Sequence, residues 1–464
     1  MTLSLSDTLA LLGYVLSLWL IVRVFLWKRH AEKNYWHKRP DVTIEKVRAI
    51  ANERNKVLPK FSILIPAKEE QEVIEKTIES FCRLNYPKEL YEILVVTEEQ
   101  ELMKYQEMSD ASSSTPAIVE DALKRLQGED GLTVKHVMVP YDFDGQLNGK
   151  CIGKKVTGFK GRALNYAVQT VSQDTNWISI YDADSRPNPD VLLFVANMIV
   201  QDGTLIKVLE GPAYKMYNFK SIQTVCKPYG IGDNVIQEWR LPSLFKEVPY
   251  LTGSNLYIER RTLEDVKGFN PLSLNECVDF GVKCYLQKGI MPEFLPCGTN
   301  EQIAPTYKSY FKQQLRWACG LLDVFSDVLK NKEKLSMRKC RILYQLFLKG
   351  PINWGFHQGF TALCLFLLYT HLSGFTSSQN TMFLSAVNVQ QKVVALFAQI
   401  LPFYFLWKFS PLIEDGEKGR LKQFLSLLIA PVSGLLAVLP FTTALFLKLF
   451  RIQPKIWFRT PRTG

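Results

Sequence analysis

Two carboxylates one residue apart follow an apolar run in the middle of the chain. Asp182-Ala183-Asp184 comes directly after Trp-Ile-Ser-Ile-Tyr, which has the composition of a buried strand. Carboxylate oxygens are ligands that Mg²⁺ and Mn²⁺ prefer, and a cation held in this way can bind a diphosphate. An isolated Asp-x-Asp triplet is usually a solvated turn. Its position at the end of an apolar strand instead predicts a metal site with Asp182 and Asp184 as ligands.

A second chemical motif lies further along the chain, at Gln313-Gln314-Leu315-Arg316-Trp317. A helix places Gln313 and Arg316 on one face, where both can hydrogen-bond a phosphate. The indole of Trp317 can stack on a sugar ring. Arg and Trp are also common in helices that lie on a membrane surface, so this motif by itself allows both interpretations.

Four predicted strands have to position these groups. They cover residues 61–67, 91–101, 133–140 and 177–187. Segments with helical spacing lie between them, and this alternation predicts an α/β fold with a parallel sheet. Ligands bind beyond the carboxyl ends of such strands, which is where the acidic residues fall. The polar stretch 103–131 is interpreted as a loop.

Apolar segments flank this polar central part, which we assign to residues 40–335. Residues 8–27 are long enough to cross a bilayer, and Lys28 and Arg29 follow them. This order predicts an uncleaved anchor within residues 1–30 and places the central domain in the cytoplasm. Because Arg23 interrupts the run, a buried helix of the central domain is the alternative.

Three more apolar segments, 354–372, 393–407 and 424–447, predict transmembrane or interfacial helices over residues 343–450. The last one contains Pro431, Gly434 and Pro440, which favours a re-entrant or interfacial segment. Residues 451–464 form a basic tail that prefers the cytoplasm. The predicted protein is therefore an integral, multi-pass protein of the cell membrane.

The composition limits the partners. The 464 residues include 56 Lys+Arg against 45 Asp+Glu, a net charge of +11, which indicates an anionic partner. The basic residues gather at the ends of the apolar segments, as membrane lipid and topology require, so no nucleic-acid partner is expected. The 9 Cys contain no CxxC pair, which predicts reduced thiols without a zinc site.

In this order, the motifs resemble those of the membrane-integrated family 2 glycosyltransferases, the group with cellulose, chitin and hyaluronan synthases. The similar segments are residues 66–70, 95–99, 160–165, 181–189, 252–255, 268–271, 301–306 and 313–317. The resemblance implies a GT-A-like domain with a Rossmann-like nucleotide-binding sheet. It also implies Mg²⁺ or Mn²⁺ and inverting transfer of a hexose from a nucleoside diphosphate sugar, for which we expect a UDP-sugar. The substrate-binding residues carried over are Glu70, Glu98, Glu99, Lys160, Asp182, Gln313, Arg316 and Trp317.

Two positions depart from the family pattern. Thr97-Glu98 stands where the family has two aspartates, at the strand end that contacts the uracil base, so this contact falls to Glu98 or shifts to Glu99. The second departure concerns the general base. Cys277 stands where the family has the aspartate that acts as general base, and a neutral thiol is a poor base at neutral pH. Glu276 or Asp279 takes the role in one interpretation. In a second, the protein is a catalytically impaired homologue that binds nucleotide sugar as a membrane scaffold or sensor. A register error of one residue in the comparison is the third.

The resemblance also implies the partners. They are a nucleoside diphosphate sugar, a growing polysaccharide or glycolipid acceptor, and membrane lipid. Because few spans are predicted, a pore for a polymer would need a homo-oligomer or a separate export partner.

Overall fold

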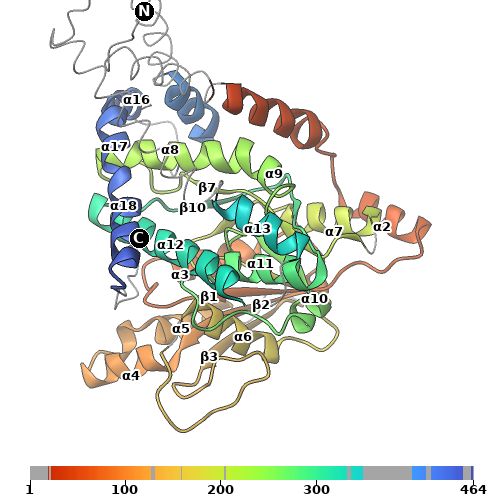
Figure 1. Cartoon of the computed structure of the whole chain (residues 1–464). Helices are drawn as coiled ribbons and strands as arrows, with labels where there is room; N and C mark the ends of the chain where they lie inside the picture. Colours follow the sequence, from red (N-terminus) through yellow and green to blue (C-terminus); the bar gives the residue numbers. More distant parts are fainter. Residues whose placement is uncertain are drawn as a thin grey trace, which may run out of the picture.

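The computed structural model describes residues 19, 22–126, 131–157, 159–202, 205–331, 336–347, 400–413, 420–452, 461 and 462. An α/β domain with a large sheet forms the lower part of the view in Figure 1, and helices lie above and beside it. The predicted α/β class is confirmed for this central domain.

The large sheet has seven strands in the order β3-β2-β1-β4-β8-β6-β9. The strands are β1 (Phe61–Pro66), β2 (Tyr91–Glu98), β3 (Thr133–Val139), β4 (Trp177–Ile180), β6 (Val208–Glu210), β8 (Leu256–Glu259) and β9 (Glu293–Phe294). Strands β3, β2, β1 and β4 are parallel to one another, whereas β8 is antiparallel to both β4 and β6. The four strands predicted from the sequence are thus parallel, as expected, whereas the antiparallel strand β8 was not predicted.

Both faces of the sheet are buried. Successive side chains of β1 point to opposite faces, and because the strand is apolar throughout, helices cover both of them. Ile63 and Ile65 pack with one set of helices, and Leu64 packs with the other. The first set is α2 (Ile44–Glu53), α3 (Ile74–Cys82), α5 (Thr115–Leu126) and α7 (Val191–Asp202). The second set is α6 (Lys160–Thr170), α10 (Arg260–Asp265) and α11 (Glu276–Lys288).

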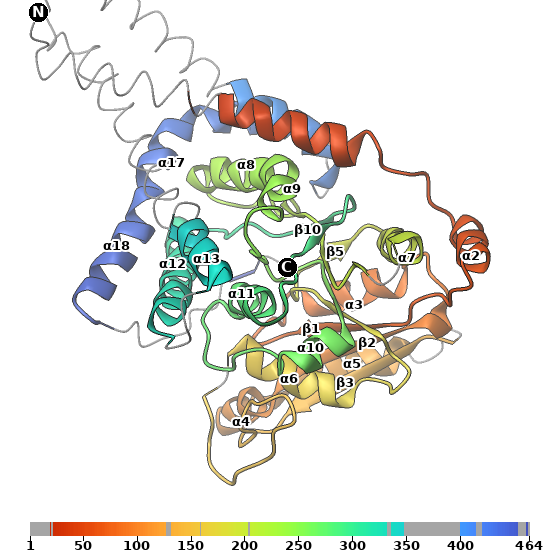
Figure 2. The same cartoon turned by 45° about the vertical axis from the view of Figure 1, so that its right-hand side comes forward.

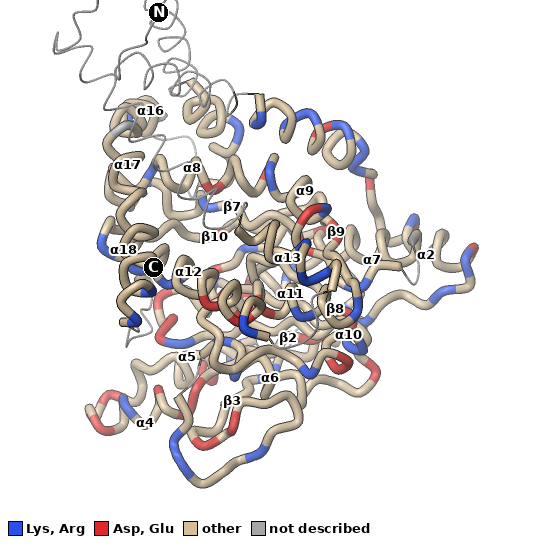
Figure 3. Tube along the Cα trace, viewed as in Figure 1, with Lys and Arg blue, Asp and Glu red and all other residues tan. Residues whose placement is uncertain are grey.

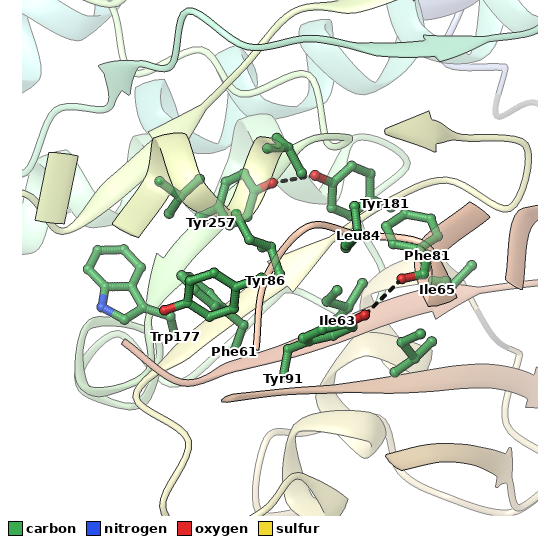
Figure 4. Packing of buried hydrophobic residues seen from close by; sticks show 14 of the residues in the cluster. Phe61, Ile63, Ile65, Phe81, Leu84, Tyr86, Tyr91, Trp177, Tyr181 and Tyr257 are labelled. Carbon is green, nitrogen blue, oxygen red and sulfur yellow. Dashed lines mark hydrogen bonds between the residues drawn. The ribbon is translucent and has the colours of Figure 1, made fainter. Parts of the chain in front are cut away.

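Figure 4 shows the first of these two core layers from close by. The hydroxyls of Tyr181 and Tyr257 point toward each other and are hydrogen-bonded, and Tyr181 also donates to Asn255 Oδ1 at 2.9 Å. All three side chains are fully buried. Since Tyr181 directly precedes Asp182, this network fixes the chain where β4 ends.

The interpretation of residues 103–131 as a loop is wrong. Helix α4 (Glu99–Glu107) begins directly after β2, and α5 follows it. Val119 and Ala122 of α5 are buried against the sheet, so a few apolar residues at helical spacing suffice to dock this polar segment. The predicted strand 91–101 is correspondingly shorter and ends at Glu98.

The domain also contains a smaller sheet and a long helix. The small sheet has the order β5-β10-β7, with β5 (Arg186–Pro187), β7 (Ala213–Lys215) and β10 (Thr299–Glu301). Thr306 is the N-cap of helix α12 (Tyr307–Lys330), and its hydroxyl accepts from Ser309 N at 3.2 Å. The remaining helices of this region are α8 (Lys227–Val235), α9 (Leu241–Leu244) and α13 (Met337–Phe347).

Three helices follow one another at the C-terminal end of the described chain: α16 (Arg420–Ser426), α17 (Ala430–Leu436) and α18 (Val438–Leu449). Helices α17 and α18 run along one side of the molecule, and α18 lies beside α12 in both Figure 1 and Figure 2. Leu315 and Cys319 of α12 pack against Phe441 of α18. Among the described residues, Val432–Leu449 is the one helical stretch long and apolar enough to cross a membrane.

The other predicted spans are described only in part. Segment 354–372 lies outside the described residues, as do most of 8–27 and the first part of 393–407. Residues 22–31 and 400–409 are helical where they are described. Trp27 of the first helix and Phe405 of the second belong to one apolar cluster with Trp239.

Candidate functional site

A cavity lies where β1, β2 and β4 end, and α6, α11 and α12 contribute to its walls. This is the edge at which the sequence predicts a ligand site. Of the residues proposed from the sequence, it is lined by Glu70, Glu98, Lys160, Asp182, Glu276, Gln313, Arg316 and Trp317. Residues from segments more than 200 positions apart therefore share one site.

Three carboxylates gather beside this cavity. Oxygen atoms of Asp182, Asp184 and Glu301 all lie within 4.8 Å of one another. Asp184 Oδ1 is buried and has no hydrogen-bond partner among the described residues. A set of carboxylate oxygens with one oxygen left unsatisfied fits a hard divalent cation such as Mg²⁺ or Mn²⁺. Glu301 was missed as a ligand from the sequence.

Basic side chains surround these carboxylates. Lys160 Nζ lies 2.5 Å from Asp182 Oδ1, Arg462 Nη1 lies 2.7 Å from Asp184 Oδ2, and Lys215 pairs with Glu301. Burial raises the pKa of Asp182, but Lys160, Lys215 and Arg462 together outweigh this and lower it to about 2. Burial instead raises the pKa of Asp184, although Arg462 opposes the rise. The pocket thus combines a group of carboxylates with cations suited to phosphate oxygens.

The Gln-x-x-Arg-Trp motif lies on α12, and Gln313, Arg316 and Trp317 all line the cavity. Arg316 Nε is buried and lacks a hydrogen-bond partner within the described part of the chain. Burial lowers the pKa of Arg316, while Glu276 and Asp182 act against this. A buried guanidinium with an unused donor is suited to an anionic ligand.

Glu98 and Glu99, the acidic residues where β2 ends, lie in two different environments. Glu98 lines the cavity, and its Oε2 accepts from Arg162 Nη1 at 2.6 Å. Glu99 begins α4, its Oε2 accepts from Tyr141 N at 2.8 Å, and it is not among the residues that line the described cavity. The geometry thus favours Glu98 over Glu99 for contact with a ligand.

Helix α11 begins at Glu276, which is mostly buried and faces the cavity. The Cys277 thiol is buried against Gly253 and donates to Glu276 Oε1 at 3.6 Å. Burial raises the pKa of this thiol well above its usual value, so it stays protonated at neutral pH. Asp279, one turn further on, interacts with Asn270 and Lys283 and does not line the described cavity.

Glu210, which the sequence did not single out, holds the loop that faces Cys277. It is fully buried, and its Oε1 accepts from Thr252 N at 2.7 Å, Thr252 Oγ1 at 2.8 Å and Gly253 N at 2.9 Å. Gly253 has a φ of 92°, a conformation that suits glycine. Lys160 Nζ also donates to Gly253 O at 2.9 Å, so Glu210 supports one wall of the cavity indirectly.

We expect Glu210 to make the stability of the protein depend on pH. Burial raises its pKa from 4.5 to about 8, although its three donors oppose the rise. Between these values the folded chain binds more protons than the unfolded chain. The free energy of unfolding should therefore fall as the pH rises from 4.5 to about 8.

Melting temperatures measured across this pH interval test the expectation. Glu210→Gln should remove a slope of up to about 1.4 kcal/mol per pH unit. The exposed Glu264→Gln variant is the control and should keep the wild-type slope. An unchanged slope in Glu210→Gln would show that Glu210 is ionised in the folded protein.

Tertiary structure adds three residues to the predicted site: Lys215, Glu301 and Arg462. Glu301 comes from β10 and Lys215 from β7, neighbouring strands of the small sheet. Arg462 comes from the basic tail, which the sequence assigned to topology, and it also lies 3.4 Å from Glu70 Oε2. The sequence carried a signal for two of the three: Glu301 opens one of the family-like segments, and Arg462 ends residues 454–462, which resemble the closing segment of bacterial family members.

The arrangement of these residues agrees with a comparison of sequences. The profile of the family described as Glycosyl transferase family group 2 matches residues 177–449, more than half of the chain. The chain belongs to this family. The matched region includes the carboxylate triad, Glu276 and the Gln-x-x-Arg-Trp motif.

Individual relatives are more distant. The chain is 27% identical over 304 residues to the protein named Probable glycosyltransferase YdaM of Bacillus subtilis, covering 64% of this chain and 62% of that protein. It is 24% identical over 280 residues to Beta-monoglucosyldiacylglycerol synthase of Trichormus variabilis, covering 59% and 52%. The chain thus matches less than two thirds of the length of either relative.

Solved structures are similar at low identity. One of them is the mannosyltransferase PcManGT of Pyrobaculum calidifontis, in complex with GDP-Man and Mn²⁺, which gives a TM-score of 0.49 at 17% identity, covering 85% of this chain and 99% of that one.

Proposed function

We propose that this chain is an inverting, GT-A-like glycosyltransferase that moves a hexose from a nucleoside diphosphate sugar, UDP-linked, to an acceptor hydroxyl. The observation that carries the proposal is the single cavity lined by Lys160, Asp182, Glu276 and Arg316, next to Asp184 and Glu301. This cavity brings together cation ligands, phosphate-binding cations and a carboxylate that can accept a proton.

The donor diphosphate is proposed to lie between the carboxylate triad and α12. Asp182, Asp184 and Glu301 would hold Mg²⁺ or Mn²⁺, which offsets the charge of the diphosphate leaving group. Arg316 supplies its unused Nε–H to the diphosphate oxygens, and Lys160 adds a second positive charge. Trp317 forms an apolar wall on which a sugar ring can stack.

Glu276 is proposed as the general base. It removes the proton from the acceptor hydroxyl as that oxygen forms its bond to the anomeric carbon and the bond from this carbon to the diphosphate oxygen breaks. Attack from the side opposite the leaving group inverts the anomeric centre. The buried, protonated Cys277 cannot take this role, and Asp279 faces Asn270 and Lys283.

The acceptor is proposed to be a glycan or a membrane lipid, and the site to lie at the cytoplasmic face of a membrane. Val432–Leu449 supports membrane association, since 22% of this apolar helix is buried within the described chain. The name of the Trichormus variabilis relative, a diacylglycerol glycoside synthase, also favours a lipid acceptor. In Figure 3, Lys and Arg are spread over many elements, a distribution unlike a single nucleic-acid-binding stripe.

Turnover by the purified full chain tests the proposal. The protein in lipid nanodiscs is supplied with Mn²⁺ or Mg²⁺, a panel of UDP-sugars and GDP-mannose, and either diacylglycerol or oligosaccharide acceptors. Release of nucleoside diphosphate is measured together with the size of the product. We expect release of UDP that depends on the cation and on one class of acceptor.

Two results would contradict the proposal differently. If no nucleoside diphosphate binds, the site is not a donor site. If UDP binds without turnover, and Cys277→Asp restores turnover, then the native protein is a nucleotide-sugar-binding scaffold or sensor. The adjacent carboxylate that this substitution restores is the one the family pattern requires.

A further inference from the structure

Arg162 is the largest side chain that is fully buried in the described part of the protein, and it is charged. Its Nη1 donates to Glu98 Oε2 at 2.6 Å and its Nε donates to Phe143 O at 3.0 Å, while Nη2 donates to Pro140 O. The guanidinium thus joins the end of β2 to the loop that follows β3. Burying a charge is costly unless it is paired in this way.

This pairing involves one of the two oxygens of Glu98. Arg162 occupies Oε2, and no hydrogen bond to Oε1 is present among the described residues. Glu98 also lines the cavity, at the end where Ala163 and Phe159 form the wall. Arg162 itself does not reach this surface, because its exposed fraction is 0%.

Helix α6 contributes one basic residue to the cavity and another to the end of β2. Lys160 and Arg162 are two residues apart, a rotation of about 200°, so their side chains leave nearly opposite sides of the helix. Lys160 pairs with Asp182 inside the cavity, while Arg162 reaches behind Glu98. One turn of α6 therefore contacts both the carboxylate triad and the end of β2.

We infer that Arg162 is a positioning residue that selects the nucleobase of the donor: it fixes the Glu98 carboxylate so that Oε1 faces the cavity as an acceptor for the ring N–H of uracil. This inference rests on the proposed function. It adds to that function a residue that orients Glu98 without touching the nucleotide.

The chemistry of the pyrimidines gives the expected selectivity. Uracil carries a hydrogen on N3 and can donate it to a carboxylate oxygen. Cytosine has an unprotonated N3, whose lone pair would face that oxygen and leave both acceptors unsatisfied. A mismatch of this kind inside a protein costs about 1–3 kcal/mol, so we expect UDP to bind about tenfold or more tightly than CDP.

Glu98→Gln tests the orientation directly. Arg162 can only donate, so it should hold the oxygen of the new amide and turn the NH₂ group toward the cavity. That group can donate to N3 of cytosine and opposes N3–H of uracil. We expect the ratio of UDP to CDP affinity to fall about 100-fold, from a preference for UDP to a preference for CDP.

The matched variant is Glu98→Gln combined with Arg162→Met. It is neutral at both positions, whereas the single variant keeps the buried guanidinium beside a neutral amide. Without the guanidinium the amide can rotate, so we expect the two nucleotides to bind within about threefold of each other. Dissociation constants are measured by calorimetry with Mn²⁺, and melting temperatures report on folding.

The outcomes distinguish a failure of the role inferred for Arg162 from a failure of the proposed function. If Glu98→Gln keeps the wild-type preference for UDP, or if the single and double variants have the same ratio, Arg162 does not orient Glu98. If the double variant fails to fold, the single variant still decides, since its inverted ratio depends on the guanidinium. If the wild-type protein binds neither UDP nor CDP, the proposed function fails instead.

Discussion

Asp184→Asn is expected to weaken Mn²⁺ binding by at least about 100-fold and to lower turnover by about 1,000-fold. Asp184 contributes a buried oxygen without a hydrogen-bond partner in the described chain, and an amide supplies no negative charge in its place. Mn²⁺ affinity is measured by electron paramagnetic resonance in the absence of nucleotide. This readout does not depend on which sugar or acceptor the protein uses.

The control for this variant is Asp190→Asn. Asp190 interacts with Asn85 and does not line the described cavity, so Mn²⁺ affinity should stay within about twofold of wild type. Asp184 also accepts from Gln302 N at 2.8 Å, and melting temperatures must show that the variant keeps its fold. Wild-type Mn²⁺ affinity in folded Asp184→Asn would contradict the assignment of the metal site.

Glu276→Gln is expected to lower turnover by about 10²–10⁴-fold while UDP binds with nearly unchanged affinity. The substitution preserves the shape of the side chain and removes its ability to take a proton. In the proposed site, Arg316, Lys160 and the cation bind the diphosphate instead. Turnover and UDP affinity are therefore measured on the same preparation, and a selective loss of turnover supports the role of base.

Two neighbouring substitutions separate the candidates for the base. Asp279→Asn should leave turnover within about threefold of wild type, and so should Cys277→Ser, because neither side chain is positioned to accept the proton. If Asp279→Asn instead removes turnover and Glu276→Gln does not, the base is Asp279.

The α/β class and most of the parallel strands could be predicted because they depend on local sequence. Strand β1 is a continuous apolar run between polar segments, and period-two burial of Ile63 and Leu64 on opposite faces requires helices on both sides of the sheet. The antiparallel strand β8 could not be predicted in this way. Leu256–Glu259 has the same kind of composition as a parallel strand, and its direction depends on the path of the chain around Asn255.

Helices α4 and α5 show a second limit. The segment is polar on average, and only a few residues such as Val119 and Ala122 contact the core. Composition therefore predicted a loop, whereas the free energy that forms these helices comes from docking against the sheet.

The sequence by itself determined the chemical types at the site: the Asp-x-Asp pair after β4, the Gln-x-x-Arg-Trp motif and the absence of an aspartate at Cys277. Their spacing along the chain was sufficient to recognise them, because the end of a strand and one face of a helix are each formed by residues close together in the sequence. Tertiary structure decided which groups meet. It added Glu301 to the carboxylates, directed Glu276 into the cavity but Asp279 toward Lys283, and used Arg162 to fix Glu98. These outcomes depend on contacts between segments far apart in the chain, and a pattern of neighbouring residues contains no information about such distances.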